Sequence, residues 1–193
     1  MSAPVAERLM TTEELLALPE DGVDRWLIRG QLREKRGEDV TKRNRWHSHI
    51  EAQITGLLYV WLQQQPQPRG RLYSGEAGFR LRRNPDSTVG IDVAYVSVEV
   101  ATRESDNTTL IDGLPVLAVE ILSPSTTQEE IDEKVHLYLE VGIPLTWVIN
   151  IRFCTVTVYR PGAEPEMKNI TQELSGEPHL PGFRVNVTQI FAR

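Results

Sequence analysis

The chain has 193 residues, of which 40% are hydrophobic and 25% charged, with one cysteine and a formal net charge of −6. This size supports one domain with a sizeable core, so we expect residues 1–193 to form a single domain. The acidity argues against a uniformly basic nucleic-acid-binding protein, and one cysteine excludes an internal disulfide. No apolar run suits a signal peptide or a membrane span, so we expect a cytoplasmic protein with no membrane partner.

The first third of the chain is predicted to hold a short helix, a hairpin and a long helix. Threonines at 11 and 12 precede a leucine-rich run, which favours a capped helix, and residues 24–34 read as two strands turning at Arg29-Gly30. Apolar side chains recur at helical spacing over residues 45–64. His47 falls on the inward face of this helix, where a buried or helix-start histidine is a more common role than a catalytic one.

Positive charge is concentrated in two segments. Residues 33–45 hold six basic and three acidic side chains, and residues 69–83 hold five arginines and one acid, Glu76. If the two segments converge in the fold, they form a basic rim for a phosphate backbone; solvated surface charge on two loops is an equally good interpretation. Residues 71–83 are predicted to form a strand, in which Gly75 and Gly78 indicate an irregularity around Glu76.

Two apolar, strand-like segments each carry one carboxylate. Asp92 lies within residues 91–96, and Glu120 lies within residues 116–122. A carboxylate in a buried strand costs several kcal/mol, in order of magnitude, unless a cation or donors compensate it. Two such groups on neighbouring strands also repel each other. A divalent cation between them removes both penalties, and Mg²⁺ prefers hard oxygen ligands of this kind.

The helix that follows Glu120 carries a lysine close to its inward face. Thr127 and Glu130 have the spacing of a capping box, and Gly142 followed by proline ends the helix. An inward stripe at 131, 135 and 138 places Lys134 at its edge, from which the ammonium can reach back toward the two acids. Spacing alone leaves two interpretations open. The three residues form a metal site, or Lys134 neutralises Glu120 in an internal salt bridge while Asp92 accepts a backbone donor.

The last part of the chain is predicted to hold a hairpin and an apolar tail. Residues 145–150 and 155–159 read as its two strands, and one apolar segment ends at Phe191. Cys154 lies in a strand-like context, where we expect a buried thiol.

The acid in one strand, the acid in the next and the lysine together resemble the PD-(D/E)XK nuclease superfamily. More closely, the chain resembles the bacterial putative restriction endonuclease family within it. The similar stretches are residues 27–32, His47, residues 120–125, Lys134 with Tyr138, residues 141–144, residues 147–150 and residues 180–183. The resemblance implies a restriction-endonuclease-like α/β (α+β) fold with a mixed central sheet flanked by helices. It also implies phosphodiester hydrolysis in nucleic acid, with DNA as the expected substrate, and Mg²⁺, or Mn²⁺, as the cofactor.

In this interpretation Asp92 and Glu120 hold one or two metal ions, and Lys134 orients the nucleophile or offsets charge on the phosphoryl oxygens. His47 and Glu76 are lesser candidates for shaping the site. A homodimer is expected only by analogy of fold.

The chain departs from the family pattern at two positions. Leu122 stands where the superfamily has its lysine, and Trp26 stands where the family has a glutamate in its first hairpin. The second departure favours an alternative function, a nuclease-fold module that binds nucleic acid or serves as a scaffold without efficient chemistry.

Overall fold

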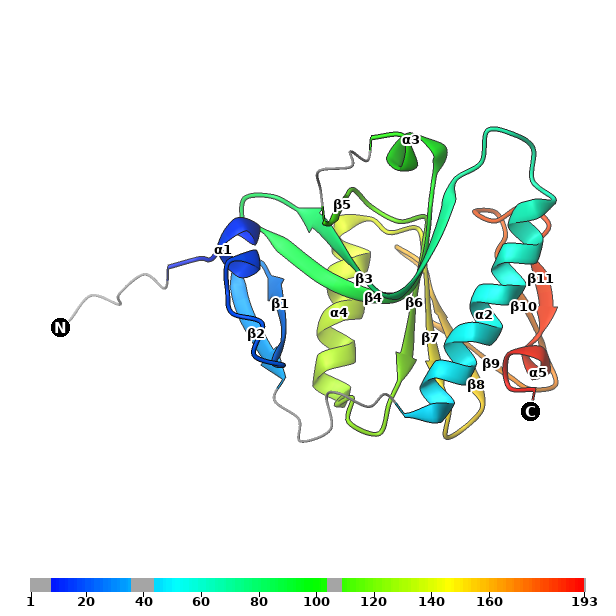
Figure 1. The fold of residues 1–193 in the computed structure, drawn as a ribbon. Helices are drawn as coiled ribbons and strands as arrows, with labels where there is room; N and C mark the ends of the chain where they lie inside the picture. Colours follow the sequence, from blue (N-terminus) through cyan, green and yellow to red (C-terminus); the bar gives the residue numbers. More distant parts are fainter. Residues whose placement is uncertain (1–7, 36–43, 104–108, 193) are drawn as a thin grey trace.

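A computed structural model describes residues 8–35, 44–103 and 109–192. It shows a mixed sheet with helices on both faces, which confirms the predicted fold class (Figure 1). The helices are α1 (Thr12–Leu16), α2 (Arg45–Gln63), α3 (Val98–Ala101), α4 (Gln128–Val141) and α5 (Val187–Ile190). The strands are β1 (Asp24–Ile28), β2 (Gln31–Lys35), β3 (Arg71–Arg82), β4 (Ser87–Val96), β5 (Ile111–Asp112), β6 (Leu117–Leu122), β7 (Leu145–Asn150), β8 (Thr155–Tyr159), β9 (Glu166–Asn169), β10 (Glu173–Ser175) and β11 (Arg184–Asn186). None of the helices in these ranges is long and apolar enough to cross a bilayer.

Strand β4 organises the main sheet, whose order is β2-β1-β4-β6-β7-β8-β9. Strand β3 runs antiparallel along the whole of one edge of β4. Strands β1 and β6 must therefore share the other edge of β4. Along this edge, β1 pairs with β4 only at Thr88, and β6 pairs with β4 only at residues 93–95. Residues 89–92 lie between these two partners, so the sheet opens at this point.

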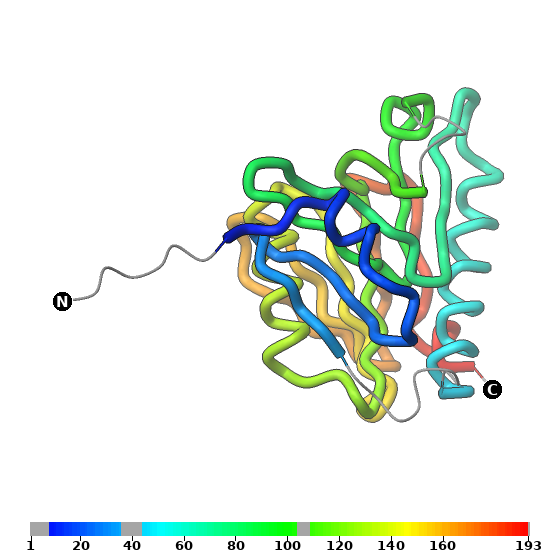
Figure 2. The backbone as a smooth tube through the Cα atoms, turned by 60° about the vertical axis from the view of Figure 1, so that its left-hand side comes forward, coloured from blue at the N-terminus to red at the C-terminus, as the bar shows by residue number. Residues whose placement is uncertain are grey.

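The two faces of the sheet are covered by different helices. In β6, Leu117 and Val119 belong to the cluster that includes α2, whereas Ala118 between them belongs to the cluster that includes α4. This alternation is the period of two that a strand buried on both faces requires. Figures 1 and 2 show α2 beside β10, β11 and α5 at the C-terminal end of the described chain.

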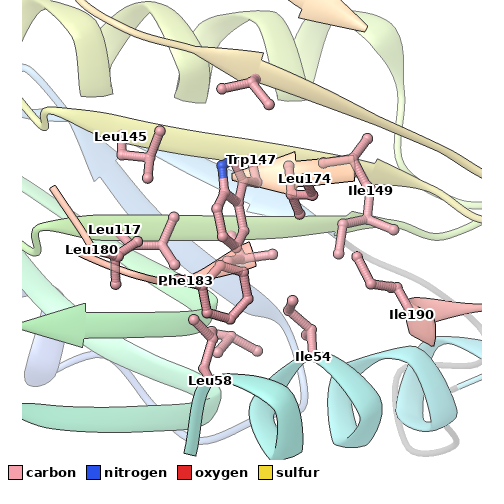
Figure 3. Close-up of a cluster of buried hydrophobic side chains, with 14 of the residues drawn as sticks. Ile54, Leu58, Leu117, Leu145, Trp147, Ile149, Leu174, Leu180, Phe183 and Ile190 are labelled. Carbon is pink, nitrogen blue, oxygen red and sulfur yellow. The ribbon is translucent and has the colours of Figure 1, made fainter. Parts of the chain in front are cut away.

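Aromatic and branched side chains fill the core between α2 and the sheet. The rings of Trp147 from β7 and Phe183 from the segment before β11 lie 5.5 Å apart at its centre (Figure 3). Ile54 and Leu58 of α2 approach the same cluster from the opposite side. Packing of this kind sets the position of α2 relative to β6.

The predicted helix signals are confirmed. Thr127 and Glu130 form the capping box of α4, and Gly142 ends the helix with a left-handed conformation at φ +88°. Only glycine adopts that conformation at little cost. Helix α3 and strands β5 and β9 to β11 were not predicted, because they are too short to show a period.

One prediction was wrong and others lie outside the described residues. Cys154 occupies the turn between β7 and β8 at φ +50° and is partly exposed, so it is not a buried strand residue. Residues 36–43, which make up most of the first basic segment, lie outside the described residues, as do residues 104–108.

Basic side chains of both charged segments, and Arg29 before the first of them, form ion pairs with acids of the protein. Arg33 pairs with Glu133 at 2.6 Å and Lys35 with Glu130 at 2.9 Å, so these two residues fasten β2 to α4. Further pairs join Arg29 and Arg82 to Glu140, and Arg83 to Asp112. These five cations are therefore paired with acids of the protein.

The buried carboxylate of Asp86 connects α1 to the start of β4. It accepts from the Thr12 amide at 2.8 Å, the Thr12 hydroxyl at 2.7 Å and the Asn84 amide at 3.2 Å. Burial alone would raise the pKa of Asp86, but these hydrogen bonds outweigh it and hold the pKa below its ordinary value.

We predict that Asp86→Ala lowers the free energy of unfolding by about 1–3 kcal/mol at neutral pH, because buried donors lose their acceptor. The measurement is urea unfolding. The difference from the unchanged protein should shrink as the pH falls through the acidic range, since a depressed carboxyl pKa stabilises only while the group is ionised. Asp112→Ala, which removes an exposed partner of Arg83, is the control and should change stability little. Equal losses in both variants would contradict the prediction.

Candidate active site

The structure brings Asp92 and Glu120 together where the sheet opens. Val93 of β4 pairs with Val119 of β6. The same antiparallel register continued by one residue would set Asp92 opposite Glu120, but the pairing stops there. Both residues are buried, with 5% and 6% of their surface exposed. The two predicted acids thus occupy adjacent positions on neighbouring core strands.

The Asp92 carboxylate is held by donors from β6 and α2. Its Oδ2 accepts a hydrogen bond from the Ile121 amide at 2.7 Å. This amide belongs to β6 and lies just beyond the last β4–β6 residue pair, Val93 with Val119. Its Oδ1 lies 3.3 Å from Nε2 of His47, which is in the first turn of α2 and is itself buried. His47 therefore contacts one of the two acids directly.

The Glu120 carboxylate is held from α4. Tyr138 donates its hydroxyl to Oε1 at 2.5 Å, and Lys134 donates its ammonium to Oε2 at 3.0 Å. Lys134 also donates to the carbonyl of Gly90 at 3.0 Å, in the part of β4 that lies between its two partner strands. Lys134 and Tyr138 lie one helical turn apart, which is why both reach the same carboxylate.

The charges of this cluster act strongly on one another. Burial and, more weakly, the Asp92 carboxylate raise the pKa of Glu120, although Lys134 and Tyr138 oppose the shift. Burial by itself would lower the pKa of Lys134, but the carboxylates of Glu120, Asp92 and Asp24 outweigh it and raise that pKa. Burial raises the pKa of Tyr138, and the carboxylates of Glu120 and Asp92 raise it further. At neutral pH, Tyr138 is therefore a neutral donor and Lys134 an ammonium.

An open cleft of about 1260 Å³ gives access to these residues. All five candidates from the sequence line it, namely His47, Glu76, Asp92, Glu120 and Lys134. The β6–α4 loop and Trp26 form other parts of its wall. Although the two acids are largely buried, a ligand can approach them through this cleft.

Glu76 reaches the cleft through a bulge in β3. The register between β3 and β4 shifts between Ser74 and Ala77, and both Gly75 and Glu76 have positive φ, of +87° and +58°. The predicted irregularity is confirmed. Bulges of this kind redirect a side chain without ending the strand.

The donor set fits a small divalent cation. Each carboxylate oxygen of Asp92 and Glu120 has one close donor and keeps further lone-pair capacity, which a cation can use. Mg²⁺ is typically bound by one or two carboxylates, with water and substrate oxygens completing its shell. Among the described residues, no group of three or more His, Cys, Asp or Glu side chains is placed to hold a metal.

Sequence reasoning missed three residues that act on this cluster. Tyr138 was predicted as a packing residue and as part of the family resemblance but not as a partner of Glu120, and Glu51 and Asp24 were not singled out. Both Tyr138 and Glu51 follow a predicted site residue by four positions on a helix, Lys134 and His47 respectively, and that spacing is the signal that could have identified them. Asp24 lines the cleft two residues before Trp26, on the same strand.

Restriction-endonuclease-like nucleases typically have a mixed sheet with helices on both faces. They also place two acids at an opening in the sheet, with a lysine beside them. The chain belongs to the Uma2 family, described as putative restriction endonuclease, whose model matches residues 12–188. It is also similar to the crystal structure of a putative nuclease belonging to DUF820 from Anabaena variabilis ATCC 29413. The TM-score is 0.77 at 22% identity, over 94% of this chain and 97% of that one. That likeness shows the fold alone. No curated protein matches the chain.

We predict that Tyr138→Phe lowers the free energy of unfolding by about 1–3 kcal/mol, because a buried carboxylate oxygen loses its hydrogen-bond donor. Chemical denaturation at pH 7 provides the measurement. Tyr59→Phe removes a hydroxyl from an exposed position of α2 and should change stability by less than about 0.5 kcal/mol. A Tyr138→Phe variant as stable as the Tyr59→Phe control would show that the hydroxyl does not hold Glu120.

Proposed function

We propose that the protein is a nuclease that hydrolyses phosphodiester bonds of nucleic acid, with DNA as the expected substrate and Mg²⁺ or Mn²⁺ as the cofactor. We propose further that residues 1–193 act as one restriction-endonuclease-like domain. The observation that carries the proposal is the pair of buried carboxylates beside a lysine ammonium at the wall of an open cleft. Membership of the Uma2 family supports the same activity.

Each residue of the cluster has a role in this proposal. Asp92 and Glu120 would hold the divalent cation, which supplies a Lewis acid that offsets negative charge on the phosphate. The Lys134 ammonium orients the attacking water or offsets charge that develops on the phosphoryl oxygens. Tyr138 and His47 hold the two carboxylates in place, and Glu76 contributes to the wall of the cleft.

In the alternative interpretation Lys134 neutralises Glu120 in a salt bridge while Asp92 accepts a backbone donor, and both contacts are present. They leave unexplained why a second buried acid stands beside the ion pair, where it raises the pKa of Glu120. Such a repulsion has no value for stability. In a cation-binding site, the repulsion between the two carboxylates increases the affinity for a positive ion.

A second candidate function is a module that binds nucleic acid, or serves as a scaffold, without efficient chemistry. Trp26 favours it, because this residue is 8% exposed and packs in the cluster that contains Ile28 and Val89. A buried indole at that position supplies no ligand and no base.

Incubation of the purified protein with plasmid DNA and with structured RNA, in Mg²⁺, Mn²⁺ or EDTA, tests the activity and substrate class together. We expect cleavage of DNA in either metal and none in EDTA. Binding of nucleic acid without cleavage in any metal would favour the second function instead.

Calorimetric titration with Mn²⁺ tests the metal site itself. We expect saturable binding to the unchanged protein and loss of binding in Asp92→Ala, because that change removes one of the two proposed ligands. Asp132→Ala removes a carboxylate from the exposed face of α4 and should bind Mn²⁺ as the unchanged protein does. Equal binding by both variants would remove Asp92 from the site.

Lys134→Met separates chemistry from metal binding. The variant keeps the aliphatic stem of the side chain but loses the ammonium, so we expect Mn²⁺ affinity to be retained and cleavage to fall by at least about 100-fold. Circular dichroism verifies folding, and Lys168→Met on the exposed edge strand is the control. Unchanged cleavage by a folded Lys134→Met protein would exclude Lys134 from the mechanism.

A further inference from the structure

A chain of side chains links Asp92 to the bulge of β3. Oδ1 of Asp92 lies 3.3 Å from Nε2 of His47, and Nδ1 of the same ring lies 3.8 Å from Oε2 of Glu51. The other oxygen of Glu51 accepts from the Gly75 amide at 2.5 Å. The carboxylate of Glu51 therefore joins two parts of the site that are otherwise separate, the Asp92 end and the bulge that carries Glu76.

The chain is buried along most of its length. Side-chain exposure is 7% for Asp92, 9% for His47 and 12% for Glu51. His47 and Glu51 lie one turn apart on α2, so the backbone of the helix holds their relative position. A carboxylate can only accept, so the ring must donate from Nε2 to Asp92. The Nδ1–Oε2 separation of 3.8 Å is longer than a hydrogen bond, so Glu51 acts on the ring through the charge of its carboxylate.

We propose that Glu51 is a positioning residue of the site. Through His47 it orients the Asp92 carboxylate toward the bound cation, and through Gly75 it sets the bulge that brings Glu76 to the cleft. Groups that orient a metal ligand commonly contribute about 10- to 100-fold in metal affinity. This inference rests on the proposed function, because the orientation of Asp92 matters for a cation that Asp92 binds.

Glu51→Gln distinguishes the two contacts of this residue. The amide oxygen still accepts from Gly75, so the bulge keeps its anchor, but the charge beside His47 is lost. We expect Mn²⁺ affinity, measured by calorimetry, to fall about 10- to 100-fold while unfolding stays close to that of the unchanged protein. Glu164→Gln removes the same charge from an exposed turn and should not alter the affinity. Identical affinities for the two variants would overturn the proposal.

A double-mutant cycle shows whether Glu51 acts through His47. We expect His47→Ala to weaken Mn²⁺ binding, and Glu51→Gln to cause no further loss in the His47→Ala background. Residues that act through a shared partner are non-additive in this way, whereas independent effects on folding add. Additive losses would show that Glu51 does not act through the imidazole.

A measurement without metal separates this inference from the proposed function. In the metal-free protein, long-range ¹H–¹⁵N spectra report the two ring nitrogens of His47. We expect both Glu51→Gln and Asp92→Asn to shift these signals, and Glu164→Gln to leave them unchanged. Shifted signals in a protein that binds no Mn²⁺ would refute the proposed function but support the coupling of Glu51 to Asp92 through His47. Unshifted signals would refute that coupling.

Discussion

Two carboxylates repel each other inside this sheet, and the surrounding structure compensates that repulsion. Asp92 and Glu120 are each contacted by two donor groups, and no donor is shared between them. The Ile121 amide can donate to Asp92, and the Gly90 carbonyl can accept from Lys134, because the β4–β6 pairing ends at Val93. In a fully paired sheet, hydrogen bonds between the strands would occupy such backbone groups. The cleft and the acid cluster thus have a common origin in the strand pairing.

Local sequence patterns predicted the parts of the site but not the way in which they are assembled. An acid inside an apolar strand is visible at Asp92 and Glu120, the capping box at Thr127 marks the start of α4, and its apolar stripe places Lys134 at the edge of the inward face. The opening beside Gly90 depends instead on which strands share an edge of β4. That is a long-range property, and no periodicity records it. The hydrogen bond from Tyr138 was missed because its apolar ring satisfied the packing pattern by itself.

The ion pairs of the first hairpin show why charge counts in a sequence are a poor guide to binding surfaces. Arg33 and Lys35 look like contributions to a phosphate-binding rim, but their partners Glu130 and Glu133 lie about a hundred residues later. The hairpin is joined to β4 by a single residue pair, and the buried side chains of Trp26 and Ile28 attach it to the core, while its ion pairs with α4 add to this attachment. The two ion pairs thus add a salt-sensitive contribution to a wall of the cleft that apolar packing also holds.

The two acids are held by helices from different packing clusters. His47 of α2 contacts Asp92, whereas Lys134 and Tyr138 of α4 contact Glu120. Helix α2 belongs to the cluster around Trp147 and Phe183, and the inner face of α4 packs in a separate one. The distance between the two carboxylates consequently depends on how α2, the sheet and α4 pack against one another. A cavity opened beneath either helix would move one acid relative to the other, so mutations in the distant core act on the geometry of the site without touching it.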